Sequence, residues 1–156
     1  MKAYMKTHRG LVREQNEDTI CVAEPLYVLA DGMGGHQAGE VASALAARTL
    51  CETLRDMQPS ADALTRGYLA ANSAVFARQK EDETLSGMGT TMTALWEDQE
   101  YVFVGQIGDS RAYLYRDGKL HQITEDQSMV GEMLRAGAIT EEQARSHPYR
   151  NVITQA

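Results

Sequence analysis

The feature that most constrains the fold is a short apolar run that ends abruptly in a glycine-rich segment. Residues 26–30 read LYVLA, a continuous apolar run of the kind that forms a strand buried on both faces. Residues 31–36, DGMGGH, follow at once. Because glycine populates backbone conformations that helices and strands do not use, we expect a flexible connection here. A buried strand that leads through such a connection into helical sequence is consistent with an α+β domain.

The rest of the chain predicts two long helices and a series of strands. Apolar residues recur at helical spacing from Ala38 to Met57 and from Ala61 to Lys80, with Ser60 as the N-cap of the second helix. Strand patterns run from Thr19 to Glu24, Thr91 to Trp96, Tyr101 to Ile107, Ala112 to Tyr115 and Lys119 to Ile123. Further on, we expect a helix over Ser128 to Ala136, a capping box at Thr140 to Gln143, and the start of another strand at Asn151 to Thr154. This order predicts a layered domain with antiparallel strands.

The charge balance excludes one broad class of partner. Fifteen lysines and arginines stand against 22 aspartates and glutamates, so the formal net charge is -7. The basic residues are scattered singly, whereas binding to a nucleic-acid backbone requires clustered Lys and Arg. The strongest apolar stretch, Val41 to Ala47, is far too short to cross a bilayer. We therefore expect neither a nucleic acid nor a membrane as partner.

The chain has two cysteines, Cys21 and Cys51, without the spacing of a metal site. Their number and placement favour free thiols in a reducing compartment over a disulfide. The first ten residues also lack the apolar core of a signal peptide. We therefore expect a cytoplasmic protein.

The glycine-rich segment does not fit a nucleotide-binding loop. Gly34 and Gly39 have the separation of a phosphate-binding loop, but Glu40 and Val41 follow where Lys and Ser or Thr are needed. A carboxylate at that position repels phosphate. Gln37 replaces the third glycine of the dinucleotide fingerprint.

Acidic residues instead occur next to predicted strands at three places. Asp31 follows the buried strand, Glu17 and Asp18 precede the first strand, and Asp109 follows the strand that ends at Ile107. Carboxylates gathered at strand ends suit a hard cation such as Mg²⁺ or Mn²⁺, which prefers oxygen ligands. Spacing alone leaves a metal site and ordinary surface acids equally open. A Ser110 nucleophile within Gly-Asp-Ser lacks a suitable histidine and acid partner.

Read together, several segments resemble the metal-dependent protein serine/threonine phosphatases of the PPM (PP2C) family in their bacterial form. They follow one another in order along nearly the whole chain: residues 9–18, 29–36, 38–42, 87–91, 104–113, 123–126, 130–132 and 151–154. The resemblance implies a four-layer α-β-β-α sandwich, in which two antiparallel sheets are flanked by helices. It also implies that residues 1–156 form a C-terminally incomplete catalytic domain, with a flap-like segment at about residues 127–150.

The resemblance also implies a role for each acid. Asp31 would bridge two Mn²⁺ or Mg²⁺ ions, and the Gly32 carbonyl and Glu17 would complete the surroundings of the second ion. Asp18 would hold metal-bound water without touching the metal. Asp109 would contribute to a third metal position.

The implied reaction is hydrolysis of phosphoserine or phosphothreonine by water activated between the two ions. Arg13, with its planar fork of donors, would hold the phosphate oxygens. Met33 stands where some members of the family carry a histidine proposed as proton donor. Water or a substrate group would then protonate the leaving group, and His36 is not at the equivalent position.

The family's later aspartate motifs are missing from this sequence, so one metal would lack most of its protein ligands. Two other hypotheses therefore stand beside the enzyme: an inactive phosphoprotein- or partner-binding module of the same fold, and two copies that complete each other by exchanging strands. The resemblance implies a serine/threonine kinase and its substrates as partners.

Overall fold

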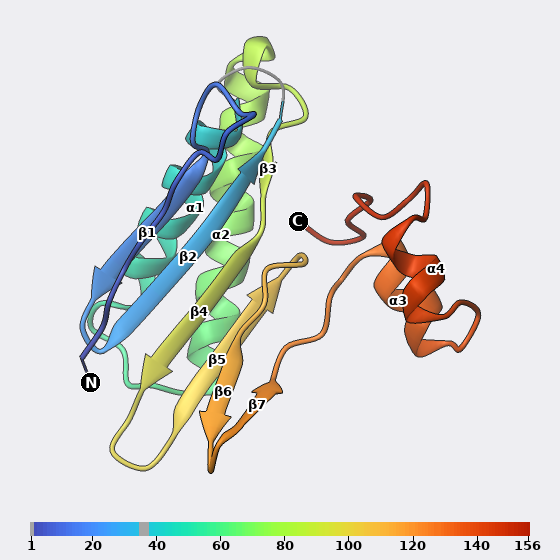
Figure 1. Cartoon of the computed structure of the whole chain (residues 1–156). Helices are drawn as coiled ribbons and strands as arrows, with labels where there is room; N and C mark the ends of the chain where they lie inside the picture. Colours follow the sequence, from blue (N-terminus) through green and yellow to red (C-terminus); the bar gives the residue numbers. More distant parts are fainter. Residues whose placement is uncertain (1, 35–37) are drawn as a thin grey trace.

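A five-stranded antiparallel sheet forms the centre of the molecule. The computed structural model describes residues 2–34 and 38–156. Its main strands are β1 (Asp18–Ala23), β2 (Leu26–Met33), β4 (Met92–Glu97) and β5 (Val102–Ile107), in the order β1-β2-β4-β5 (Figure 1). The short strand β3 (Gly89–Thr90) pairs with the end of β2.

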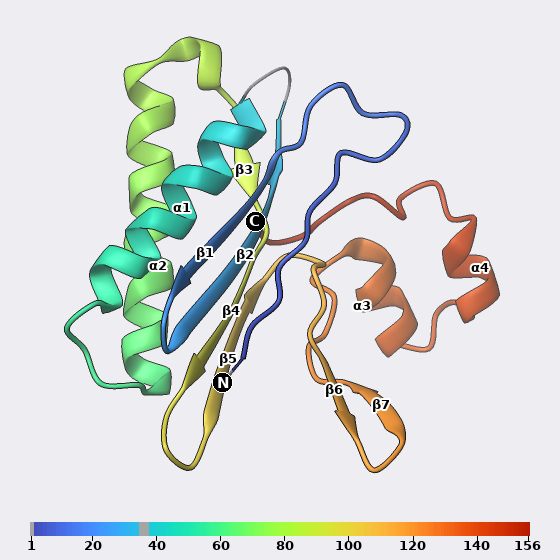
Figure 2. The same cartoon turned by 60° about the vertical axis from the view of Figure 1, so that its left-hand side comes forward.

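Two long helices cover one face of this sheet. Helices α1 (Ala38–Leu54) and α2 (Ala61–Glu81) lie side by side on it (Figures 1 and 2). The core lies between these layers, where alternate residues of β2 meet the small side chains of α1, such as Ala42 and Ala47, which are fully buried. Because these side chains are small, the helix packs close to the sheet. Ser60 caps α2 by accepting a hydrogen bond from the Ala63 amide at 3.2 Å, as its sequence position predicts.

The smaller elements lie on the opposite side of the sheet. Figure 2 shows the N-terminal segment, the hairpin of β6 (Tyr113–Arg116) and β7 (Lys119–Gln122), and helices α3 (Met129–Arg135) and α4 (Glu141–Arg145) there. A single-turn 3₁₀ helix, η1 (Glu83–Leu85), follows α2. Ser128 and Thr140 cap α3 and α4, and Thr140 and Gln143 form the expected capping box.

The prediction of two antiparallel sheets with helices is confirmed, and in the described residues the second sheet consists of β6 and β7 alone. The glycine-rich segment was predicted wrongly as a connection from Asp31 onward, because β2 continues to Met33. Asp31 pairs with Asp18, and Gly32 pairs with Thr90, so strands on both sides hold this segment extended. The last two residues of the predicted connection, including His36, lie outside the described residues.

Two further predictions need correction at the ends of elements. The first helix ends at Leu54 rather than Met57, and Met57 instead donates its amide to the Leu54 carbonyl in a turn. The strand expected at Asn151 to Thr154 is reduced to one isolated bridge between Ile153 and Ser128. Among the described residues, no helix is long and apolar enough to cross a membrane.

Gly105 provides a test of the packing between α2 and the sheet. A Cβ atom at this position in β5 would lie 2.6 Å from Cε2 of Tyr68 and 2.9 Å from Cδ2 of Leu64. We expect Gly105→Ala to lower the free energy of unfolding by about 1–3 kcal/mol through overpacking, measured by urea denaturation. The neighbouring Val104→Ala is the control, because Val104 is 36% exposed and should cost less than about 1 kcal/mol. Equal stability of Gly105→Ala and the wild type would contradict this packing.

Candidate metal centre and phosphate site

The candidate site begins with two aspartates that face each other on neighbouring strands. Asp31 near the end of β2 pairs with Asp18 at the start of β1. Residues directly opposite in an antiparallel pair carry their side chains on the same face of the sheet. For this pair it is the face away from α1 and α2, because the alternate residues Ala30 and Gly32 are buried beneath it. The structure therefore brings these two predicted site residues together.

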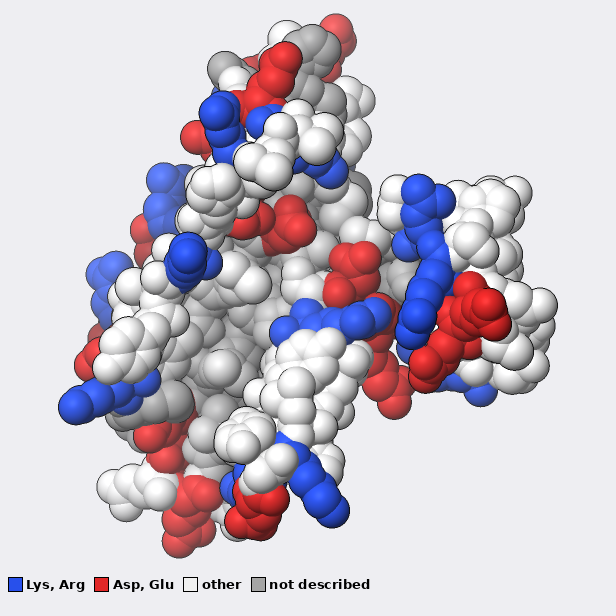
Figure 3. Space-filling model, in the orientation of Figure 1, with Lys and Arg blue, Asp and Glu red and all other residues white. Residues whose placement is uncertain are grey.

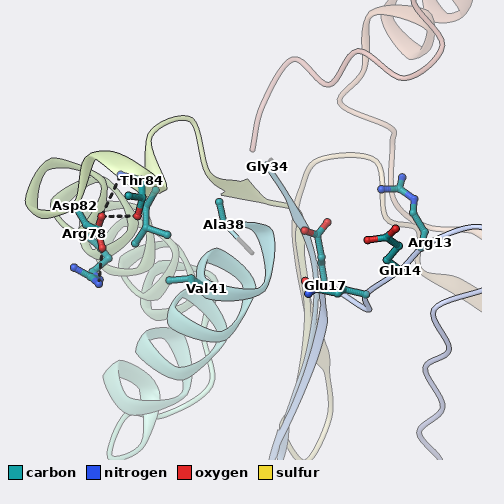
Figure 4. Close-up of a pocket in the computed structure, with 11 residues that line it drawn as sticks. Arg13, Glu14, Glu17, Gly34, Ala38, Val41, Arg78, Asp82 and Thr84 are labelled. Carbon is teal, nitrogen blue, oxygen red and sulfur yellow. Dashed lines mark hydrogen bonds and ion pairs between the residues drawn. The ribbon is translucent and has the colours of Figure 1, made fainter. Parts of the chain in front are cut away.

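Glu17 is held at the junction between β2 and α1 by contacts that require glycine. The Gly32 amide donates to the Glu17 carbonyl at 3.1 Å, and the Ser43 hydroxyl of α1 donates to the same carbonyl at 2.7 Å. A Cβ atom on Gly32 would overlap the Gly39 carbonyl, and one on Gly39 would lie 2.8 Å from Cδ of Glu17. The Glu17 carboxylate therefore lies against the first turn of α1, where a negative charge is stabilised (Figure 4).

Asp109 reaches the site through a turn that Thr91 ties to β2. Thr91 donates its amide to the Asp31 carbonyl at 2.9 Å, and its hydroxyl accepts from the Asp31 amide at 3.2 Å. The same hydroxyl lies 2.8 Å from Oγ of Ser110. Gly108 begins the turn with φ of 94°, a conformation suited to glycine, and a Cβ there would lie 2.7 Å from Cγ2 of Thr91. Thr91 is fully buried, so it connects the two acidic segments rigidly.

The other charged residues predicted for the site lie within electrostatic reach of the Asp31 carboxyl group. Partial burial raises the pKa of Asp31, and Asp18, Asp109 and Glu17 raise it further, while Arg13 acts in the opposite direction. Acidic side chains gather in the middle of this face, with basic side chains to either side (Figure 3). Three carboxylates that disfavour the charged form of a fourth create a site that a cation stabilises.

The oxygen atoms of this site suit a hard divalent cation. The described residues, however, do not form a complete set of side-chain ligands for one. Carboxylates and the Gly32 carbonyl offer only oxygen, which Mn²⁺ and Mg²⁺ accept. In residues 2–34 and 38–156, however, no three or more His, Cys, Asp or Glu side chains are grouped closely enough to enclose an ion. A metal ion at this place would therefore need water for a large part of its ligands.

Two residues that sequence reasoning missed orient Asp18. The Thr7 hydroxyl donates to Oδ2 of Asp18 at 2.5 Å, and the Asn16 side-chain amide donates to that hydroxyl at 2.8 Å. Oδ1 of Asn16 also accepts from the Asp18 amide at 3.1 Å. Asn16 belongs to the segment that resembles the phosphatase family and could have been noticed there, whereas nothing marks Thr7 in the sequence.

Arg13 lies beside a cavity of about 920 Å³ next to the site. Figure 4 shows Arg13, Glu14 and Glu17 on one side of this cavity and the residues that follow α2 on the other. Arg78, in the last turn of α2, forms an ion pair with Asp82 there at 3.3 Å. Arg13 is exposed, so its guanidinium is accessible to a ligand that approaches Asp31.

A second cavity, also of about 920 Å³, lies between the Asp109 turn and helices α3 and α4. Arg111 lines it and forms two hydrogen bonds with the Asp126 carboxylate, at 2.7 and 2.6 Å. The pairing raises the pKa of Arg111. Sequence reasoning gave neither residue a role, because the pairing joins segments on either side of the β6-β7 hairpin.

Comparison with known proteins shows to which family the chain belongs. The model of the family described as Protein phosphatase 2C matches residues 9–155. The chain belongs to the protein phosphatase 2C family. It is 46% identical over 154 residues to the serine/threonine protein phosphatase PstP of Mycobacterium tuberculosis, covering 97% of this chain and 30% of that protein. It is 38% identical over 167 residues to the serine/threonine phosphatase stp of Listeria monocytogenes, covering 100% of this chain and 66% of that protein.

A solved structure of this family also superposes on the fold. The catalytic domain of PstP in complex with two manganese ions matches with a TM-score of 0.82 and 44% sequence identity, covering 89% of this chain and 61% of that domain. This phosphatase 2C chain thus spans less than a third of the full PstP sequence and about three fifths of its catalytic domain.

The raised pKa of Asp31 predicts an effect on stability without metal. A carboxyl whose pKa is higher in the folded state destabilises the fold as pH rises through that pKa, so ionised Asp31 is unfavourable at neutral pH. We expect Asp31→Asn to raise the melting temperature by about 1–3 °C at pH 7.5 in a chelator. The gain should shrink toward pH 4, where the wild-type carboxyl is increasingly protonated.

Glu100→Gln is the matched control for Asp31→Asn, because it removes the same charge at an exposed position outside the site. Thermal unfolding by circular dichroism measures both variants. An equal gain in the two variants would show that net charge, and not the neighbours of Asp31, is responsible.

Proposed function

We propose that the protein hydrolyses phosphoserine and phosphothreonine in proteins, with Mn²⁺ or Mg²⁺ as cofactor. The observation that carries this proposal is the position of Asp31, which lies within electrostatic reach of three carboxylates and of Arg13. Membership of the phosphatase 2C family, and the two manganese ions in the related PstP domain, support the same chemistry.

In this proposal Asp31, the Gly32 carbonyl and Glu17 hold the ions, and Asp109 contributes to a further position. Asp18 keeps its orientation through Thr7 and holds ordered water. The ions, when bound, supply activated water for attack on phosphorus. The glycine contact at the start of α1 fixes the backbone that carries these ligands, so they do not have to reorganise when metal binds.

Arg13 binds the phosphoryl group in this proposal. Its guanidinium presents a planar fork that matches two phosphate oxygens, and Lys lacks this geometry. Met33 cannot donate a proton, and its side chain packs near Gly89, where a Cβ would lie 3.4 Å from its Cγ. Water or a substrate group therefore protonates the leaving alkoxide.

We further propose that residues 1–156 are part of a phosphatase catalytic domain and that residues 127–150 form a flap over its substrate. The start of the segment is anchored: Gln127 donates its amide to the Gly108 carbonyl at 3.0 Å, and Met129 donates to the carbonyl of Val152, just beyond the segment's end, at 2.9 Å. The partners of the protein would be cytoplasmic phosphoproteins and the serine/threonine kinase that phosphorylates them. The two free thiols support a reducing compartment.

One observation favours the alternative of a module that binds phosphoproteins without cleaving them. The described residues contain no cluster of three metal-ligating side chains, so a metal held here would depend largely on water. Association of two copies through open strands also stays a prediction. It concerns β1 and β5, the edge strands of the large sheet, and the exposed Val102 on β5 supports it.

Manganese-dependent hydrolysis of a phosphothreonine peptide tests the proposal. We expect turnover that falls by about 100-fold or more in Asp31→Asn and about 10- to 100-fold in Arg13→Lys, because the bidentate phosphate contact is lost. Phosphate release measures the rate, and sedimentation of the same sample gives the oligomeric state.

The control for this assay is Arg116→Lys, an exposed residue at the hairpin end of β6 that should leave the rate unchanged. A folded wild-type protein without turnover at any Mn²⁺ or Mg²⁺ concentration would contradict the enzymatic function. Calorimetric binding of the peptide by that inactive protein would then support the binding module.

A further inference from the structure

The two cysteines of the chain meet across the interface between β1 and α1. Cys21 lies in β1, an edge strand of the large sheet, and is half-buried, while Cys51 lies in α1 and is buried. Their Sγ atoms are 2.7 Å apart, and both cysteines are free. Residues 30 positions apart in the sequence therefore place their thiols in direct contact.

The surroundings hold the pair in this position. Two residues before Cys21 on the same side of β1, the Thr19 hydroxyl lies 2.9 Å from the Ser43 hydroxyl of α1. Ser43 and Cys51 both belong to the buried side of α1. The helix and the strand are thus joined at Thr19 as well as at Cys21, and neither thiol takes part in the candidate metal centre.

We propose that Cys21 and Cys51 form a site of reversible oxidation, which hydrogen peroxide converts into an intramolecular disulfide that links β1 to α1. In the first step the Cys21 sulfur takes one oxygen from the peroxide, which gives a sulfenic acid and one water. In the second step the Cys51 sulfur displaces that oxygen from Cys21. The S–O bond breaks, the S–S bond forms, and the oxygen leaves as water with the hydrogen of the Cys51 thiol. A small dithiol restores both thiols by exchange.

The environment of each thiol assigns the order of these steps. Cys21 lies on an edge strand where peroxide can reach it. Burial raises the pKa of Cys51 to about 12, and its hydrogen bond with Cys21 adds to this effect. Cys51 is therefore protonated and enclosed at neutral pH, which disfavours its direct reaction with peroxide. Oxidation of Cys21 removes the thiol contact that helps to raise the pKa of Cys51, and the Cys51 sulfur then attacks the sulfenic acid beside it while its proton passes to the leaving oxygen.

The disulfide would close a loop that contains all of β2 and most of α1. A crosslink of this span restricts the unfolded chain, and the existing contact between the sulfurs means that little of the fold has to move. We therefore expect the oxidised protein to melt about 5–10 °C above the reduced protein.

The test is mild peroxide treatment of the full chain in the absence of metal, followed by thiol titration and intact-mass measurement. We expect both thiols to disappear together with a loss of about 2 Da, the protein to stay monomeric on a non-reducing gel, and dithiothreitol to reverse the change. A gain of about 32 Da, as expected for sulfinic acid at one cysteine with the other thiol intact, would overturn the proposal. Disulfide-linked dimers as the main product would overturn it as well.

Cys51→Ser and Cys21→Ser provide the matched controls. In Cys51→Ser, Cys21 has no partner, so we expect a sulfenic acid that dimedone traps and no rise in melting temperature. In Cys21→Ser, the enclosed Cys51 should stay a thiol at the same peroxide dose. Rapid oxidation of Cys51 in that variant would contradict the proposed order. These experiments measure thiol oxidation and melting temperature, so their outcomes are independent of the proposed phosphatase activity.

Discussion

The close contact between Gly32 and Gly39 is the constraint on which the rest of the candidate site depends. It lets the end of β2 and the first turn of α1 meet backbone to backbone, and any Cβ at either position would collide with main-chain or Glu17 atoms. At this contact the Glu17 carbonyl accepts hydrogen bonds from both the Gly32 amide and the Ser43 hydroxyl. One junction thus sets the position of a helix, a strand and the acidic residue between them.

The same region shows how a folded chain can hold an arrangement that is unfavourable by itself. Like charges around Asp31 oppose its ionisation, and the fold tolerates this cost because the backbone around the acids is fixed by the sheet register and by Thr91. Sites that carry such a cost commonly serve a ligand, since binding removes the repulsion. The excess of acidic residues in the chain comes partly from this group of carboxylates and partly from ordinary surface acids.

Local patterns were sufficient to predict the elements whose decisive contacts are close in sequence. Ser60 and Thr140 cap their helices through amides three residues away, so their roles follow from the sequence. Asp31 to Met33 misled the prediction because glycine usually marks a connection, and only pairing with β1 and β3 keeps this stretch extended. The acidic site residues could be found from their positions beside predicted strands, whereas the role of Arg13 came from the family resemblance. The role of Thr91 could not be found, because its hydroxyl meets the amide of a residue 60 positions away.

The link through Thr91 also bears on when the site comes into existence during folding. Asp18 and Asp31 become neighbours as soon as β1 pairs with β2, but Asp109 joins them only after β4 has paired with β2 and β5 with β4. The full repulsion among the acids therefore arises in the last part of sheet assembly. A cation bound there favours the finished sheet over every partly folded form, since only the finished sheet presents all the oxygens. Ion binding would then stabilise the native state in addition to preparing the site for catalysis.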